Sequence, residues 1–214
     1  MKAVRIAANG GPEVITLADA ETREPGAGEV RVKHHAIGVN FIDTYQRSGL
    51  YKIALPSPLG LEAAGVVDAI GEGVTRFKLG DRIAYASGPL GAYAEANVVK
   101  AAQAVKLPDA IPFDIAAASL LKGMTARFLL RKTFRVERGH DVVIHAAAGG
   151  VGQIAVQWAK YLGASVIAVV GSDAKAEIAK SLGADHTIIQ GRDDIAKRVR
   201  EITGVGAHVV YDSV

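Results

Sequence analysis

The feature that most limits the possible folds is a glycine-rich turn at residues 146–152, between a strand pattern and a helix pattern. The apolar run at 142–146 has the length of a buried strand. Apolar residues then recur at helical spacing, namely Val151, Ile154, Ala155, Trp158 and Leu162. A strand, a tight turn and a helix in this order form the context in which a glycine turn binds a dinucleotide. A tight turn without a ligand is the alternative.

The glycines of this turn suit an anion. A diphosphate needs backbone that lets it approach closely and a helix N-terminus whose N–H groups face it. Gly149, Gly150 and Gly152 allow the approach, and Gly152 also lets the helix pack tightly on the strand. The match to G-x-G-x-x-G is imperfect, because Ala147 takes the place of the first glycine.

The second half of the chain alternates between strand and helix patterns. Strands are expected at 142–146, 165–170, 187–190 and 208–214, with helices between them. Ser172 is expected to cap the second of these helices, and Asp193 and Asp194 to lie in the first turn of the third, where negative charge suits the helix dipole. This alternation predicts a parallel sheet with right-handed crossovers.

The first half has a different pattern. Short apolar runs at 30–36, 64–70, 82–86 and 93–99, separated by Gly and Pro, predict a small barrel or sandwich. Pro112 suits the first turn of a helix, and a second helical run is expected over 124–132. We therefore expect two domains, a β-rich domain at 1–118 and a nucleotide-binding domain at 119–214.

The end of the second strand of the nucleotide-binding domain indicates which nucleotide binds. An NAD site usually has an acid there for the ribose hydroxyls, but this strand ends in Val170 and Gly171. Lys175 lies one turn into the next helix and suits a 2′-phosphate, unless it is an ordinary surface lysine. Asp173 keeps NADH open as the alternative. We favour NADPH.

Composition excludes several classes of function. The chain has no cysteine, which excludes disulfides, Cys-ligated zinc and thiol catalysis. The net charge of +3 comes from scattered Lys and Arg, so no nucleic-acid partner is expected. The first 14 residues do not resemble a signal peptide, and no apolar run approaches about 20 residues, so we expect a cytoplasmic protein without a membrane span.

Seven motifs together resemble the quinone oxidoreductases of the zinc-free medium-chain dehydrogenase/reductase superfamily, the group that includes zeta-crystallin. They occur in the family's order along the whole chain: GVNFIDTY at 38–45, RSGLY at 47–51, GLEAAGVV at 60–67, LGDR at 79–82, KGMT at 122–125, HAAAGGVG at 145–152 and VYDSV at 210–214. The resemblance implies an α/β chain with an N-terminal GroES-like β-barrel and a Rossmann doubly wound parallel sheet. It also implies NADPH-dependent transfer of reducing equivalents to a quinone or similar conjugated carbonyl, without zinc.

The resemblance also implies the site residues. Those expected beside the nicotinamide and the acceptor are the catalytic candidates Asn40, Asp43 and Tyr45. Those expected to bind NADPH are Asn40, Tyr51, Thr125, Ala148, Gly149, Gly150, Val151, Gly152, Gly171, Ser172, Lys175 and Gln190. Tyr45 and Asn40 are our candidates for contact with the acceptor oxygen, although both could equally be structural residues of a loop beside the barrel.

Three departures from the family pattern matter. Zinc alcohol dehydrogenases have Gly-His-Glu where this chain has Gly60-Leu61-Glu62, so no catalytic zinc is expected and Glu62 is expected to be structural. Gln190 stands where relatives often have an aromatic residue or His, which weakens the case for NADPH. The chain ends after its fourth Rossmann strand although such a domain normally has six. We therefore expect a truncated form of a longer, homodimeric protein.

Three other functions stay open. One is a zinc-free enoyl or acyl-thioester reductase on the same fold. Another is a non-catalytic, NADPH-binding protein in the manner of a crystallin. A Rossmann methyltransferase would share the glycine turn, but the GroES-like first half argues against it.

Overall fold

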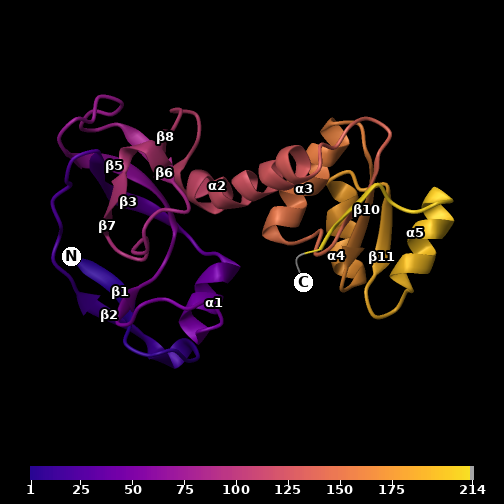
Figure 1. Ribbon diagram of the computed structural model, residues 1–214, viewed down its shortest axis with the longest axis horizontal. Helices are drawn as coiled ribbons and strands as arrows, with labels where there is room; N and C mark the ends of the chain where they lie inside the picture. Colours follow the sequence, from indigo (N-terminus) through magenta and orange to yellow (C-terminus); the bar gives the residue numbers. More distant parts are fainter. Residues whose placement is uncertain (213–214) are drawn as a thin grey trace. The chain divides into compact units, whose positions relative to one another are not determined.

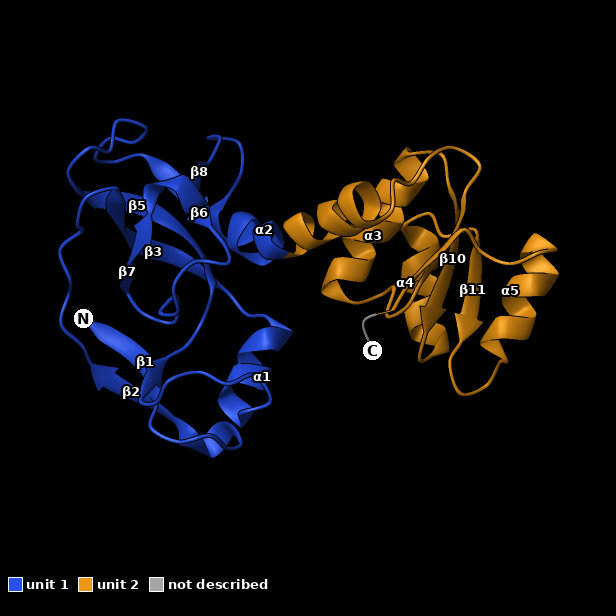
Figure 2. Cartoon of the chain, viewed as in Figure 1, with its two compact units in different colours: residues 1–121 blue, residues 122–214 orange. Residues whose placement is uncertain are grey.

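The computed structural model (Figure 1) describes residues 1–212, and Ser213 and Val214, which end the expected fourth strand, lie outside the described residues. The chain divides into two compact units, Met1–Leu121 and Lys122–Val214 (Figure 2). The division falls within helix α2 (Phe113–Phe128).

Unit 1, of which every residue is described, is built from antiparallel strands. One sheet has the order β7-β3-β5-β6-β8 and another the order β2-β1-β4. The strands are β1 (Lys2–Ile6), β2 (Ile15–Asp19), β3 (Glu29–Gly38), β4 (Ser57–Pro58), β5 (Glu62–Ile70), β6 (Arg82–Tyr85), β7 (Ala96–Lys100) and β8 (Ala104–Lys106). Short 3₁₀ helices η1 (Pro12–Val14) and η2 (Ala101–Gln103) and helix α1 (Phe41–Ser48) complete the unit. The four predicted strands of this half correspond to β3, β5, β6 and β7.

The core of unit 1 follows from the alternation of its strands. Successive residues of a strand point to opposite faces, so Val30 and Val32 of β3 lie on one face and are fully buried. They pack in one cluster with Val67 of β5 and Ile83 of β6. β3 then leads at Gly38 into the loop before α1, which carries several of the expected site residues.

Helix α2 is longer than predicted. The two expected helical runs form one helix, which continues into a π-helical turn, η3 (Leu129–Thr133). Gly123, the weakest helix former between the two runs, does not interrupt it. A single glycine costs a helix only about 1 kcal/mol and does not end it unless a capping motif follows.

Unit 2 contains, within the described residues, a four-stranded parallel sheet of order β11-β10-β9-β12. The strands are β9 (Asp141–Ile144), β10 (Ser165–Val170), β11 (His186–Ile189) and β12 (Val209–Tyr211), and the helices between them are α3 (Gly150–Tyr161), α4 (Asp173–Ser181) and α5 (Ile195–Thr203). This confirms the predicted succession of strands and helices.

Helices cover both faces of this sheet (Figure 1). α3 and α4 pack on the face that carries Val166, Ala168 and Val170 of β10. α5 packs through Val199 on the opposite face, which carries Ile167 of the same strand. The alternating residues of one apolar strand thus supply two cores, as the doubly wound prediction requires.

The helix starts are partly as expected. Ser172 caps α4, because its side chain accepts a hydrogen bond of 3.4 Å from the backbone N–H of Lys175. Asp193 and Asp194, however, precede α5 instead of forming its first turn. Asp194 is the N-cap and accepts from Lys197 N at 3.0 Å, while Asp193 accepts from Ile189 N at 2.8 Å. A carboxylate satisfies exposed N–H groups better from the cap position than from within the helix.

Within residues 1–212, no helix is both long and apolar enough to cross a membrane.

Candidate functional site

The glycine turn of unit 2 joins β9 to α3 by a tight loop. Ala146 has a φ of 47°, in the left-handed region that favours glycine. The N–H of Gly149 bonds the carbonyl of Ala146 at 2.7 Å, and Gln153 Nε2 bonds the carbonyl of Ala148 at 2.9 Å. The turn is therefore held by its own backbone and by one side chain of the following helix.

The N-terminus of α3 presents bare backbone. Its N-cap is Gly149, without a side-chain cap, and the first hydrogen bond of the helix runs from Gln153 N to Gly149 O at 2.9 Å. Among the described residues, no acceptor meets the N–H groups of Gly150, Val151 and Gly152. Unpaired N–H groups at a helix start carry partial positive charge and suit a diphosphate.

Gly152 is needed for packing, as the sequence predicts. A Cβ on Gly152 would lie 2.3 Å from the carbonyl oxygen of Ala146 and 2.7 Å from backbone carbons of Ala147. No side chain fits there while α3 stays this close to the turn. At Gly150 a Cβ would lie 2.9 Å from Lys122 Cδ, so the stem of that lysine runs beside the turn.

A second group of expected residues lies where β10 and β11 end. The two strands are parallel neighbours, and Gln190 N bonds the carbonyl of Val170 at 2.8 Å. This places Gln190 beside Gly171 and Ser172. A Cβ on Gly171 would meet nothing within 4 Å, so the backbone here is open. Lys175 is exposed, and its ammonium makes no hydrogen bond or ion pair among residues 1–212.

Arg192 is a residue at this edge that sequence reasoning missed. Its Nη1 lies 3.0 Å and 3.2 Å from the two carboxylate oxygens of Asp173. Asp173, the acid that keeps NADH open as the alternative cofactor in the sequence, is therefore paired with a cation. The signal that could have revealed it is the parallel pairing of β10 and β11, which brings the loops after the two strands together.

Thr125 lies half-buried on α2. Its neighbour Ala126 packs in the same core cluster as Ala147 of the glycine turn.

The expected residues of unit 1 gather at the start of α1. Asn40 is its N-cap, and Asp43 Oδ2 accepts from Asn40 N at 2.8 Å and from the hydroxyl of Tyr93 at 2.6 Å. Asp43 is buried, so it secures the start of the helix. Burial and the bond to Asp43 raise the pKa of Tyr93, which keeps the phenol protonated as a donor.

Glu62 orients the amide of Asn40. It is fully buried, and its Oε2 accepts from Asn40 Nδ2 at 2.8 Å while its Oε1 accepts from Leu121 N at 2.7 Å. Both carboxylate oxygens are engaged, which supports the structural role expected of this acid.

The aromatic side chains of α1 and the following loop form a row. Tyr45 lies 5.4 Å from Phe41 and 5.4 Å from Tyr51 between ring centroids. Phe41 is 75% exposed and Tyr51 is 51% exposed. Phe41 was not among the expected residues, although its i, i+4 spacing from Tyr45 was visible in the sequence. The row offers flat apolar surface beside polar groups.

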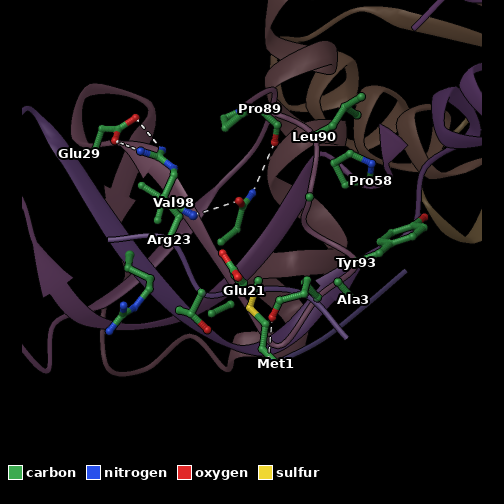
Figure 3. Close-up of a pocket in the computed structure, with 18 of the residues that line it drawn as sticks. Met1, Ala3, Glu21, Arg23, Glu29, Pro58, Pro89, Leu90, Tyr93 and Val98 are labelled. Atoms are coloured by element: carbon green, nitrogen blue, oxygen red, sulfur yellow. Dashed lines mark hydrogen bonds and ion pairs between the residues drawn. The ribbon is translucent and has the colours of Figure 1, made fainter. Parts of the chain in front are cut away.

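A cavity of about 570 Å³ in unit 1 (Figure 3) has in its wall Tyr93, whose hydroxyl bonds Asp43. None of the expected site residues lines it. Arg23 at its rim binds Glu29 through two hydrogen bonds of 2.7 Å and 3.0 Å, which hold the pKa of Glu29 at about 2. This pair leaves little charge for recognition of a ligand. Among residues 1–212, no group of three His, Asp or Glu side chains could hold a metal ion.

Comparison with known proteins gives a consistent result. Residues 26–109 match the family described as alcohol dehydrogenase GroES-like domain, and residues 150–214 match the family described as zinc-binding dehydrogenase. A quinone oxidoreductase of Pseudomonas aeruginosa is 54% identical over 215 residues, which cover 100% of this chain and 66% of that protein.

Two solved structures are similar along the whole chain. The Escherichia coli quinone oxidoreductase complexed with NADPH has a TM-score of 0.97 at 48% identity, and this chain covers 66% of it. A mycobacterial protein complexed with NADPH has a TM-score of 0.95 at 45% identity, with 67% covered. The chain thus spans about two thirds of the length of the proteins it matches.

Proposed function

Because the chain belongs to the quinone oxidoreductases of the zinc-free medium-chain dehydrogenase/reductase superfamily, we propose that it is an NADPH-dependent oxidoreductase. Its acceptor is a quinone or a similar conjugated carbonyl compound, and it uses no zinc. The observation that carries this proposal is the bare N-terminus of α3, where three backbone N–H groups have no acceptor among the described residues and the helix packs too close to the preceding turn for a side chain at Gly152.

The residues of unit 2 fit the cofactor. Ala148, Gly149, Gly150, Val151 and Gly152 would hold the diphosphate on backbone N–H groups. The adenosine ribose and its phosphate would lie at the open edge formed by Gly171, Ser172, Lys175 and Gln190. Thr125 would contact the nicotinamide end, and we propose the same role for Tyr51 of unit 1. NADPH, when bound, supplies the hydride.

The residues of unit 1 would bind the acceptor. The hydroxyl of Tyr45 makes no hydrogen bond within the described residues, so it can donate to an acceptor oxygen. Asn40 presents an amide whose orientation Glu62 fixes. A planar acceptor would lie against the aromatic row. We assign Asp43 to the support of Asn40 and Tyr93, because it is buried and both bonds end on one oxygen.

No strong acid is required by this chemistry. A reduced quinone can take its protons from water, so positioning and a hydrogen bond to the acceptor oxygen suffice. For the full-length protein we also propose a homodimer in the cytoplasm, which light scattering and cell fractionation would test.

The central experiment compares binding with turnover. Fluorescence titration should give tighter binding of NADPH than of NADH, and NADPH oxidation should be faster with a quinone than with an enoyl thioester. Faster reduction of the thioester would favour an enoyl reductase. Binding without reduction of any acceptor would favour a non-catalytic protein.

Tyr45→Phe tests the acceptor site. We expect a fall in kcat of about 10-fold, the effect of one lost hydrogen bond to a charge that develops during reaction, with NADPH affinity within about two-fold. Tyr161→Phe is the matched control, because Tyr161 is 87% exposed at the end of α3. An unchanged kcat for Tyr45→Phe would remove this residue from the site.

A further inference from the structure

The pairing of Arg192 with Asp173 changes the charge at the edge where β10 and β11 end. Asp173 is the first residue of α4. Its carboxylate could accept hydrogen bonds from the ribose hydroxyls of NADH and so favour that cofactor. In the structure that carboxylate is engaged by Arg192 Nη1 through both oxygens. The carboxylate of Asp173 is therefore paired with a cation from the loop after β11.

Arg192 keeps donors for a ligand. A guanidinium has five N–H donors in a fixed plane. The carboxylate of Asp173 accepts hydrogen bonds from Nη1. Asp193 forms an ion pair with the guanidinium, with its Oδ1 3.6 Å from Nε. Among residues 1–212, nothing accepts from Nη2. The two carboxylates therefore orient the guanidinium while one of its nitrogens stays available, in a side chain that is 58% exposed.

The surroundings leave room for a phosphate. A Cβ on Gly171, after β10, or on Gly191, just before Arg192, would meet nothing within 4 Å, so the backbone is open at both positions. Lys175 adds a second cation on the same edge, two residues after Asp173. Gln190 can donate a hydrogen bond but carries no charge, so it cannot balance a phosphate dianion.

We infer that Arg192 is a specificity-determining residue that, together with Lys175, binds the 2′-phosphate of NADPH and selects NADPH over NADH. This assignment rests on the proposed function, since it needs NADPH as the cofactor. Arg192 would donate to the phosphate from the N–H groups of Nη2, in a plane that its two carboxylate partners fix, whereas Lys175 would act as a point charge. Asp173 then serves as a positioning residue that holds Arg192 at the phosphate.

The experiment measures equilibrium binding of the adenosine half of the cofactor to the full-length protein. Isothermal titration with 2′,5′-ADP and with 5′-AMP isolates the 2′-phosphate, because the two ligands differ only there. Arg192→Gln should raise the Kd of 2′,5′-ADP about 10-fold, equivalent to about 1.4 kcal/mol, and leave the Kd of 5′-AMP within about two-fold. Arg192→Lys should restore part of the loss, because it keeps the charge but not the planar guanidinium that the two carboxylates orient.

Arg198→Gln is the matched control. Arg198 is also an exposed arginine paired with an acid, Glu201, and its loss changes the net charge by the same amount. It should leave both affinities unchanged, and circular dichroism should show all variants folded.

The outcomes separate the two proposals. Wild type that binds neither nucleotide would overturn the proposed function and this assignment with it. Wild type that prefers 2′,5′-ADP, with Arg192→Gln changing neither affinity or both equally, would overturn the assignment of Arg192 alone. Equal losses in Arg192→Gln and Arg198→Gln would also overturn it, because they would reflect overall charge.

Discussion

Gly152→Ala should destabilise unit 2 measurably. The added Cβ would lie 2.3 Å from the carbonyl oxygen of Ala146, whereas an ordinary contact begins at 3.4 Å. Because the obstacle is backbone, α3 and the turn must move apart by about 1 Å, and overpacking of this kind costs about 1–3 kcal/mol. With a urea m-value of about 2 kcal/mol/M, the unfolding midpoint should fall by about 0.5–1.5 M.

Trp158 provides the assay. It is the only tryptophan in the chain, it lies on α3, and it packs against the main core cluster of unit 2. Its fluorescence in urea therefore reports the unfolding of this unit. Gly123→Ala is the control, because a Cβ there meets nothing within 4 Å and alanine should stabilise the helix by about 0.5–1 kcal/mol. A midpoint for Gly152→Ala equal to that of wild type would refute the packing argument.

Three further predictions concern stability. Tyr93→Phe removes the 2.6 Å bond to buried Asp43, whose Oδ1 already lacks a partner among the described residues. It should lower the free energy of unfolding by about 1–3 kcal/mol, and an unchanged urea midpoint by circular dichroism would contradict this. Burial lowers the pKa of His34, whose ring lies 3.0 Å from the hydroxyl of Tyr85. The unfolded chain then binds a proton more readily, so stability should fall as the pH drops below about 6.5, by at most about 1.4 kcal/mol per pH unit. His34→Gln should flatten that slope in urea titrations at several pH values, and an equal slope would count against a buried neutral imidazole. Ala146→Gly should relieve the strain of the positive φ and raise the free energy of unfolding by up to about 1 kcal/mol. A lower melting temperature for this variant would mean that the alanine is not strained.

The parts of the fold that the sequence predicted are those that local periodicity controls. Val166, Ala168 and Val170 alternate with Ile167 and Val169 in an unbroken apolar run, which is typical of a strand covered on both faces. Such runs and the helix cap at Ser172 can be predicted from neighbouring residues alone, because they do not depend on contacts with distant parts of the chain. β2 was missed because most of its side chains are exposed, so it carries no alternating apolar signal.

The missed site residues depend on contacts between distant parts of the chain. Arg192 meets Asp173 only because β10 and β11 are neighbours in the sheet. Tyr93 reaches Asp43 across 50 residues of sequence. The motif that places Asp43 at the acceptor does not show that this carboxylate binds Asn40 N and the hydroxyl of Tyr93, the two bonds from which we propose a supporting role.

Glu62 links the side chain of Asn40, at the start of α1, to the backbone of α2. One carboxylate oxygen holds the amide at the start of α1, and the other holds the N–H of Leu121 in α2. A shorter acid could not reach both, and a neutral amide would bring an N–H against one of the two donors. Natural substitution at Glu62 should therefore be accompanied by substitution at Asn40, so that the two positions covary among homologous sequences.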